Sequence, residues 1–204
     1  MSSARLPGKV LAPLAGRPLL AWLFERLEHA RSLDAIVVAT SDEPEDDAVA
    51  AFAHEQGVAC HRGPLEDVAG RVLDAARSQD LEILVRVNGD SPLLDQRLVD
   101  RGVALLQASG ADLASNVRPR TFPPGQSVEV VWADVLQRAH AGDSSAEDRE
   151  HVTGPLYDGR FRVARFEADP PRTEPPFTVD TASDLRRIER IMLAMDRPHY
   201  EYSW

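Results

Sequence analysis

The chain alternates short β-branched runs with segments of helical periodicity, and this alternation most constrains its fold. Ile83 to Val87 is the strongest predicted strand, and Ile36 to Val38 is a second one. Apolar residues at helical spacing predict helices near 19–27, 64–79, 96–108 and 182–195. Strands that alternate with helices of this length favour an α/β fold, with a mostly parallel sheet and helices on both faces. Such sheets bind ligands at the carboxyl ends of their strands.

Weaker signals extend this organisation over the whole chain. We expect further strands at 58–61 and 127–132, and helices at 133–140 and 147–157. Asp42, with Glu45 three residues later, predicts a capped helix that runs toward Gly57, and Thr181 with Asp184 predicts the cap of the last helix. A length of 204 residues without internal repeats is typical of one domain, 1–204.

The composition excludes several classes of protein. The net charge of −10 argues against nucleic acid as a partner, because a phosphate backbone would be repelled. No run of 18 apolar residues and no secretion signal is present, so we expect neither a membrane span nor export. The single cysteine, Cys60, cannot form an internal disulfide, which favours a reducing cytoplasm.

A cationic segment opens this acidic chain. Arg5, Lys9 and Arg17 precede the first acidic residue, Glu25, and Lys9 is the one lysine beside 22 arginines. Backbone amides in a turn at Gly8, flanked by cations, can hold the oxygens of a polyphosphate. The alternative is an ordinary solvated turn, because the G-x-x-x-x-G-K-[ST] pattern of a Walker A loop is absent.

Two aspartates follow strand-like segments. Asp90 ends the strong strand, and Asp180 stands just before the last helix. Carboxylates at these places are suited to bind Mg²⁺, which keeps waters and takes phosphate oxygens. The structural alternative is that each favours a helix N-terminus, and for Asp95 we prefer the role of a helix cap.

Seven landmarks appear in one order: Ser3-x-Arg5-Leu6-Pro7-Gly8-Lys9, Ala39-Thr40-Ser41-Asp42, Arg62-Gly63, Gly89-Asp90-x-Pro92-Leu93, Val128-Glu129-Val130, Arg149-Glu150-His151-Val152-Thr153 and Thr178-Val179-Asp180-Thr181-x-x-Asp184-Leu185. This order resembles the cytidylyltransferase family of the CMP-KDO and CMP-acylneuraminate synthetases. The greatest similarity is to its spore coat polysaccharide biosynthesis protein F branch.

The resemblance implies a nucleotide-diphospho-sugar-transferase-like, Rossmann-like fold. It implies that a sugar or sugar acid attacks the α-phosphate of a nucleoside triphosphate, usually CTP, and that pyrophosphate leaves. It assigns the site residues as follows: Ser3, Arg5, Gly8 and Lys9 on the triphosphate, with Arg5, Lys9 and Asp90 catalytic; Asp90 and Asp180 on Mg²⁺; Ala39, Thr40, Asp42 and Arg62 near the base or ribose; and Glu129, Arg149 and His151 on the acceptor.

Not every landmark has a single interpretation. Glu129 faces either a cleft or water, because it lies opposite Val128 and Val130 on an alternating strand. Arg149 and His151 contact the acceptor or a partner subunit, or belong to a charged helix surface.

The chain departs from the family pattern at its beginning. Relatives have a hydrophobic strand before the Ser-x-Arg-Leu-Pro-Gly-Lys loop, whereas this sequence starts at Met1 without one, so we expect the first strand to be missing from the sheet. This departure keeps a second hypothesis open, a catalytically inactive nucleotide-binding subunit of an active partner. The resemblance also implies a homodimer.

Overall fold

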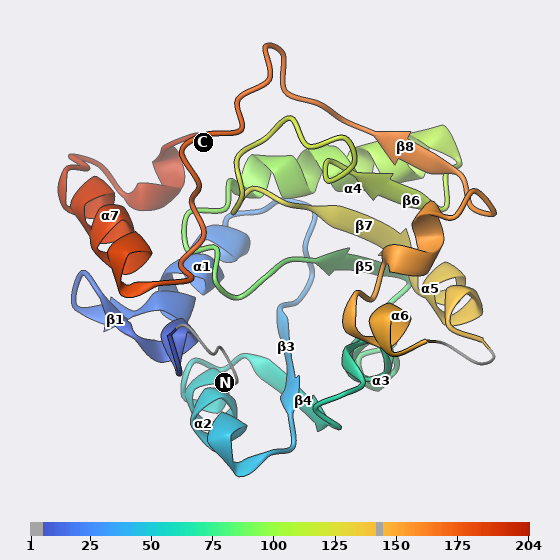
Figure 1. Ribbon diagram of the computed structural model, residues 1–204, viewed down its shortest axis with the longest axis horizontal. Coiled ribbons are helices and arrows are strands. Elements are labelled where there is room, and N and C mark those ends of the chain that lie inside the picture. Colours follow the sequence, from blue (N-terminus) through green and yellow to red (C-terminus); the bar gives the residue numbers. More distant parts are fainter. Residues whose placement is uncertain (1–5, 142–144) are drawn as a thin grey trace.

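The core of the protein is a four-stranded sheet with the strand order β5-β7-β6-β8 (Figure 1). The computed structural model describes residues 6–141 and 145–204. The strands of this sheet are β5 (Ile83–Arg86), β6 (Leu113–Ser115), β7 (Glu129–Trp132) and β8 (Val163–Arg165). β3 (Val37–Ser41) and β4 (Ala59–Gly63) form a separate parallel pair, and β1 (Pro13–Leu14) and β2 (Arg17–Pro18) form a small antiparallel one.

Helices cover both faces of the four-stranded sheet, as expected. On one face, α1 (Leu19–Glu28) and α4 (Gln96–Ser109) pack against Val128 and Val130 in the main apolar core. On the other face, Val131 packs with residues of α3 (Val68–Ser78) and α5 (Ala133–Ala139). The remaining α-helices are α2 (Asp47–Glu55), α6 (Ala146–Glu150) and α7 (Ala182–Leu193), and short 3-10 helices lie at Lys9–Leu11, Pro44–Asp46, Gly154–Tyr157 and His199–Glu201.

The α/β architecture is confirmed, but the direction of the strands is more mixed than predicted. β3 with β4 and β6 with β8 are parallel, whereas β7 is antiparallel to both β5 and β6. The reason lies in the connection from β6 to β7. No helix intervenes between these strands, so the chain turns back beside β6 without the crossover that parallel neighbours need.

The expected gap in the sheet is present. Within residues 6–141 and 145–204, β3 is hydrogen-bonded to β4 and β5 to β7, and no strand joins β3 to β5. Among the described residues, the β3–β4 pair and the four-stranded sheet are therefore separate, whereas in a continuous doubly wound fold they would be one sheet.

The predicted helix start at Asp42 is wrong. The Asp42 backbone N–H donates to the Gly63 carbonyl over 2.9 Å, which prolongs the pairing of β3 with β4 beyond Ser41. The chain then forms the 3-10 turn Pro44–Asp46, and α2 begins only at Asp47. By contrast, the predicted capping box of Thr181 and Asp184 is present at the start of α7, and Asp95 caps α4 by accepting from the Arg97 backbone N–H.

A buried arginine connects α1 with the end of the chain. The Arg26 side chain donates to the carbonyls of Leu94, His199 and Tyr202, and the residue is 2% exposed. Burial lowers the pKa of Arg26 to about 10, so the guanidinium stays charged at neutral pH. This contact fixes the segment that leads into α4 against the C-terminal residues.

In the part of the chain that the structure describes, every helix is too short or too polar to cross a bilayer.

Candidate nucleotide and metal site

The Pro-Gly-Lys segment forms a tight turn that presents Lys9. The Lys9 backbone N–H donates to the Leu6 carbonyl over 3.2 Å, with Pro7 and Gly8 at the two central positions. Gly8 has a φ of 70°, which residues with a Cβ rarely adopt, so this turn favours glycine there. Ser3 and Arg5, the other predicted triphosphate contacts of this loop, lie outside the described residues.

Asp90 and Asp180 come together although 90 residues separate them in the chain. Asp90 follows β5, and its carbonyl accepts a hydrogen bond of 2.9 Å from the Val179 backbone N–H. This bond ties the segment before α7 to the loop after β5. Asp180 then stands one residue before the Thr181 cap of α7.

Lys9 lies between the two carboxylates. Its Nζ atom is 2.6 Å from Asp90 Oδ2 and 2.8 Å from Asp180 Oδ1. The side chains of Lys9, Asp90 and Asp180 are 15%, 19% and 32% exposed, so the cluster is shielded but open to solvent. Burial lowers the pKa of Lys9, but the hydrogen bonds and charges of Asp180 and Asp90 outweigh burial and raise it. The three predicted clusters thus form one site.

This donor set fits Mg²⁺. The Lys9 ammonium shows that a cation is accommodated between Asp90 and Asp180, and both residues supply the hard oxygen ligands that Mg²⁺ prefers. No third His, Cys, Asp or Glu joins them among residues 6–141 and 145–204. Two carboxylates suffice for Mg²⁺ in nucleotide enzymes, because water and phosphate oxygens complete its shell.

The predicted base and ribose residues lie on β3 and β4. Ala39 is partly buried in β3, and Asp42 is exposed just after it. The Thr40 hydroxyl donates to the Asp46 carboxylate over 2.7 Å, so it supports the loop rather than standing free.

Arg62 holds the loop between β3 and α2. Its Nε and Nη2 atoms donate to the carbonyls of Ser41 and Glu43, both over 2.9 Å, and Nη1 is 2.7 Å from Asp47 Oδ1. All three nitrogens of the guanidinium are therefore engaged in shaping this loop.

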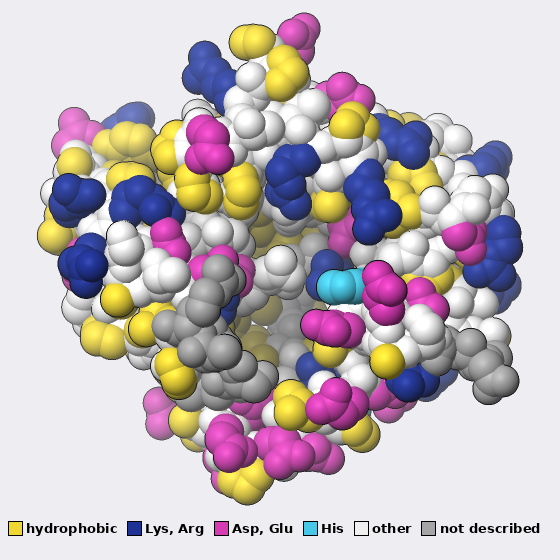
Figure 2. Space-filling view, in the orientation of Figure 1, with side chains coloured by type: hydrophobic (Ala, Val, Ile, Leu, Met, Phe, Trp, Pro, Cys, Tyr) yellow, Lys and Arg dark blue, Asp and Glu magenta, His cyan; other side chains and the backbone are white. Residues whose placement is uncertain are grey.

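The face that carries these segments is hollowed at its centre. Figure 2 shows the depression, with basic, acidic and histidine side chains around its rim. A separate cavity of about 330 Å³ lies between α1 and Tyr200, and none of the predicted site residues lines it. The cluster of Lys9, Asp90 and Asp180 is thus distinct from that cavity.

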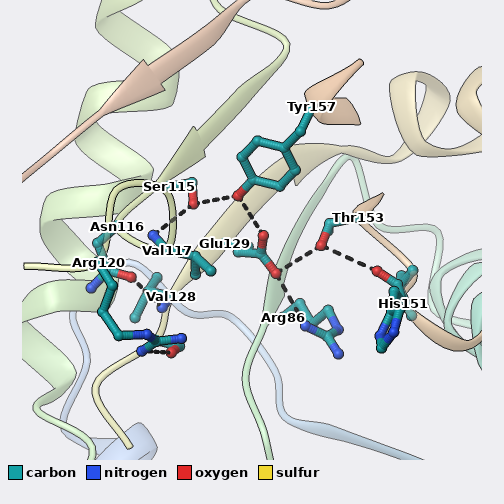
Figure 3. A network of polar contacts seen from close by, with 12 residues as sticks. Arg86, Ser115, Asn116, Val117, Arg120, Val128, Glu129, His151, Thr153 and Tyr157 are labelled. Carbon is teal, nitrogen blue, oxygen red and sulfur yellow. Dashed lines mark hydrogen bonds and ion pairs between the residues drawn. The ribbon is translucent and has the colours of Figure 1, made fainter. Parts of the chain in front are cut away.

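Glu129 belongs to a buried polar network on the β7 side (Figure 3). Its side chain is 5% exposed and accepts from Arg86 Nη1 over 3.0 Å, Thr153 Oγ1 over 2.8 Å and Tyr157 Oη over 2.6 Å. The Ser115 hydroxyl is 2.6 Å from Tyr157 Oη. Burial and the neighbouring Glu129 raise the pKa of Tyr157, so the phenol remains a donor. Glu129 therefore faces neither open cleft nor bulk water, but protein donors.

Arg149 and His151, the other predicted acceptor residues, are exposed at the end of α6. The His151 carbonyl lies 3.5 Å from the Thr153 hydroxyl, which connects this segment to the Glu129 network. Sequence analysis missed Arg86 and Tyr157. An arginine within the apolar run Ile83 to Val87 was the available signal, because a charged residue in a buried strand needs a partner.

The fold and this cluster of one cation and two carboxylates define a Rossmann-like nucleotidyltransferase. Residues 1–201 match the family described as cytidylyltransferase. The chain is 33% identical over 213 residues to spore coat polysaccharide biosynthesis protein SpsF of Bacillus subtilis, a match that covers 97% of this chain and 85% of SpsF. It is 39% identical over 165 residues to 3-deoxy-manno-octulosonate cytidylyltransferase of Anaeromyxobacter dehalogenans, covering 80% and 65% of the two chains.

A solved structure agrees with these matches. The cytidylyltransferase from Leptospira borgpetersenii superposes with a TM-score of 0.91 at 28% identity, covering 98% of this chain and 85% of that one. The chain belongs to the cytidylyltransferase family.

Proposed function

We propose that this chain is a magnesium-dependent cytoplasmic enzyme that transfers CMP from CTP to a sugar or sugar acid. Pyrophosphate is released, and the activated sugar serves the synthesis of a surface polysaccharide. The observation that carries the proposal is the position of Lys9 Nζ within 2.8 Å of both Asp90 and Asp180. The names of two relatives, a 3-deoxy-manno-octulosonate cytidylyltransferase and a spore coat polysaccharide protein, support the choice of CTP and of a sugar acceptor.

The chemistry needs charge and position rather than a nucleophilic side chain. An acceptor oxygen forms a bond to the α-phosphorus, the bond from that phosphorus to the bridging oxygen breaks, and the hydroxyl proton is lost to solvent. Such a displacement depends on alignment and on neutralising the phosphate oxygens. Magnesium, when bound, supplies positive charge at the reacting phosphate.

The residues of this chain would share the remaining tasks. Asp90 and Asp180 would hold the metal, and Lys9 with the Gly8 turn would bind phosphate oxygens once the ammonium leaves the carboxylates. Arg62 would shape the loop at Ser41 and Asp42 where the nucleoside lies. Ser3 and Arg5 are proposed triphosphate contacts on the strength of the resemblance alone.

A thermal shift series with Mg²⁺ and each of CTP, UTP, GTP and ATP tests the nucleotide. A ligand that binds the folded state at a hundred times its dissociation constant adds about 2.7 kcal/mol to the stability. We expect CTP to stabilise the protein and Lys9→Ala to lose most of this effect. Equal stabilisation by all four nucleotides would contradict the choice of CTP.

The Asp90→Asn variant tests the metal assignment. It keeps the size of the side chain but removes a charged ligand, so we expect turnover to fall by about 10²- to 10³-fold or more while the fold is retained. Pyrophosphate release and the circular dichroism spectrum are the measurements. Wild-type turnover in Asp90→Asn would falsify the metal assignment.

The resemblance also implies a homodimer, which predicts twice the monomer mass in light scattering.

A further inference from the structure

One turn in the connection from β6 to β7 contacts both segments that carry the candidate metal ligands. It comprises residues 123–126 and is called the 123–126 turn below. The Gln126 backbone N–H donates to the Pro123 carbonyl over 3.0 Å, and Gln126 is 0% exposed. The Gln126 carbonyl accepts from Asn116 Nδ2 over 2.7 Å, which ties the turn to the end of β6. The turn is therefore anchored inside the protein.

The Gln126 side chain holds the segment that follows Asp90. Its Nε2 atom donates to the Leu93 carbonyl, and its Oε1 atom accepts from the Asp95 backbone N–H, both over 2.8 Å. An amide has a donor and an acceptor at the same end, so one side chain satisfies two backbone groups of opposite kind. Leu93 and Asp95 are 5% and 2% exposed, so the loss of this amide withdraws a partner from both groups in a buried place.

The preceding residues of the same turn hold the segment that leads to Asp180. The Phe177 backbone N–H donates to the Pro124 carbonyl over 2.6 Å. Gly125 has a φ of 96°, and a Cβ there would lie 2.7 Å from the Phe177 carbonyl carbon and 2.9 Å from the Thr178 nitrogen. Glycine thus allows the two backbones to approach more closely than any residue with a Cβ would.

The two ligand segments are joined at two levels. The Val179 backbone N–H donates directly to the Asp90 carbonyl over 2.9 Å. The 123–126 turn holds the same two segments at Leu93 and Phe177, each of which lies three residues from a carboxylate. Three residues span at most about 11 Å, so both attachments are close to the ligands along the chain. A second attachment restricts the rotation of one segment against the other.

We propose that the 123–126 turn fixes the separation of the Asp90 and Asp180 carboxylates, and that Gln126 is thereby a positioning residue for the metal site. This inference rests on the proposed function for the identity of the bound ion, and it adds what holds the ligands in place. Two carboxylates that share one ion bind it more tightly when their separation is set beforehand, because less conformational freedom is lost on binding.

The coupling between Lys9 and Asp180 measures the separation without a metal. A double-mutant cycle of Lys9→Met and Asp180→Asn in urea unfolding gives this coupling, and the general cost of a background change cancels. Gln126→Met keeps the length of the side chain but removes both hydrogen bonds, so we expect the coupling to fall by half or more in this background. Gln96→Met is the matched control, because this buried glutamine donates instead to the Tyr200 carbonyl, and it should leave the coupling unchanged. An unchanged coupling in Gln126→Met, or an equal loss in both backgrounds, overturns the inference.

Mn²⁺ binding without nucleotide tests the consequence for the metal. Electron paramagnetic resonance counts the unbound Mn²⁺, and Asp90→Asn shows whether the bound ion lies at this site. We expect Gln126→Met to weaken binding by about 10-fold, since residues that orient metal ligands have effects of this size, and Gln96→Met to stay within twofold of the wild type. If Mn²⁺ binds through Asp90 and Gln126→Met binds it as tightly as the wild type, the positioning role is overturned and the proposed function stands. If binding is absent or independent of Asp90, the metal assignment of the proposed function fails, and the Lys9 coupling alone decides whether the turn fixes the two carboxylates.

Gly125→Ala tests the turn from the side of Asp180. The added Cβ would push the backbone of Phe177 and Thr178 away, so we expect the same loss of coupling to Lys9 as in Gln126→Met. Circular dichroism identifies a variant that does not fold, and the other variant then decides. A folded Gly125→Ala with the coupling of the wild type would contradict the hold of the turn on Asp180.

Discussion

Removal of the Lys9 charge should destabilise the protein when no metal is bound. In Lys9→Met the side chain keeps much of its length, but the ammonium between Asp90 and Asp180 is lost. Both carboxylate oxygens lie within 2.8 Å of the Lys9 Nζ atom, so they are less than about 6 Å apart. At an effective dielectric constant of about 20, two charges at this distance repel by about 3 kcal/mol.

The measured loss should be smaller than this Coulomb energy. The side chains are 15% to 32% exposed, so solvent and salt screen the repulsion, and the carboxylates can turn apart. We expect Lys9→Met to lower the free energy of unfolding by about 1 to 2 kcal/mol at pH 7 and low salt. Urea unfolding followed by circular dichroism measures it. Arg77→Met, which breaks an exposed ion pair on α3, should change the stability by less than about 0.5 kcal/mol.

Magnesium provides the decisive comparison. In Lys9→Met a divalent cation can take the place that the ammonium occupies, so Mg²⁺ without nucleotide should stabilise this variant more than the wild type. In an Asp180→Asn background the Lys9→Met change should cost little, because one of the two repelling charges is gone. If Lys9→Met is as stable as the wild type, and if Mg²⁺ stabilises both proteins equally, then the ion pairs of Lys9 do not stabilise the two carboxylates of Asp90 and Asp180.

Two further predictions concern stability. Burial lowers the pKa of His199, although the nearby Glu25 opposes this shift. The folded state therefore binds a proton at His199 less well than the unfolded state does. The stability that is present above about pH 6.5 is lost as the pH falls. Melting curves between pH 7.5 and 5.5 should therefore fall less steeply in His199→Gln than in the wild type; equal slopes would contradict this. Arg26→Met leaves three carbonyls without their donor in a buried place and should cost about 3 to 5 kcal/mol in urea unfolding. A cost below about 1 kcal/mol would show that these carbonyls find other donors.

Periodicity predicted the long elements because their pattern is local. α1, α4 and α7 lie where apolar residues recur at helical spacing, and the cap of Thr181 and Asp184 is a four-residue pattern that needs no tertiary contact. β6 and β8 were not predicted, because each has only three residues, which are too few to show the alternation of apolar and polar side chains typical of a strand. The start of α2 was predicted wrongly from Asp42. The Asp42 backbone N–H donates to the Gly63 carbonyl on the neighbouring strand, and a local sequence pattern does not indicate this contact.

The residue types in the loops determined the chemistry that the site can perform, namely a cation in a glycine turn, one carboxylate after a strand and one before a helix. Only the tertiary structure decided that Lys9 meets Asp90 and Asp180 across 81 and 171 residues of chain, through the Val179 bond to the Asp90 carbonyl. It also decided that Glu129 is buried against Arg86, Thr153 and Tyr157, whereas its alternating strand had left both a cleft and water as alternatives. The physical reason is that periodicity reports which face of an element a side chain occupies, whereas the partners on that face come from strands and loops whose pairing depends on the whole fold.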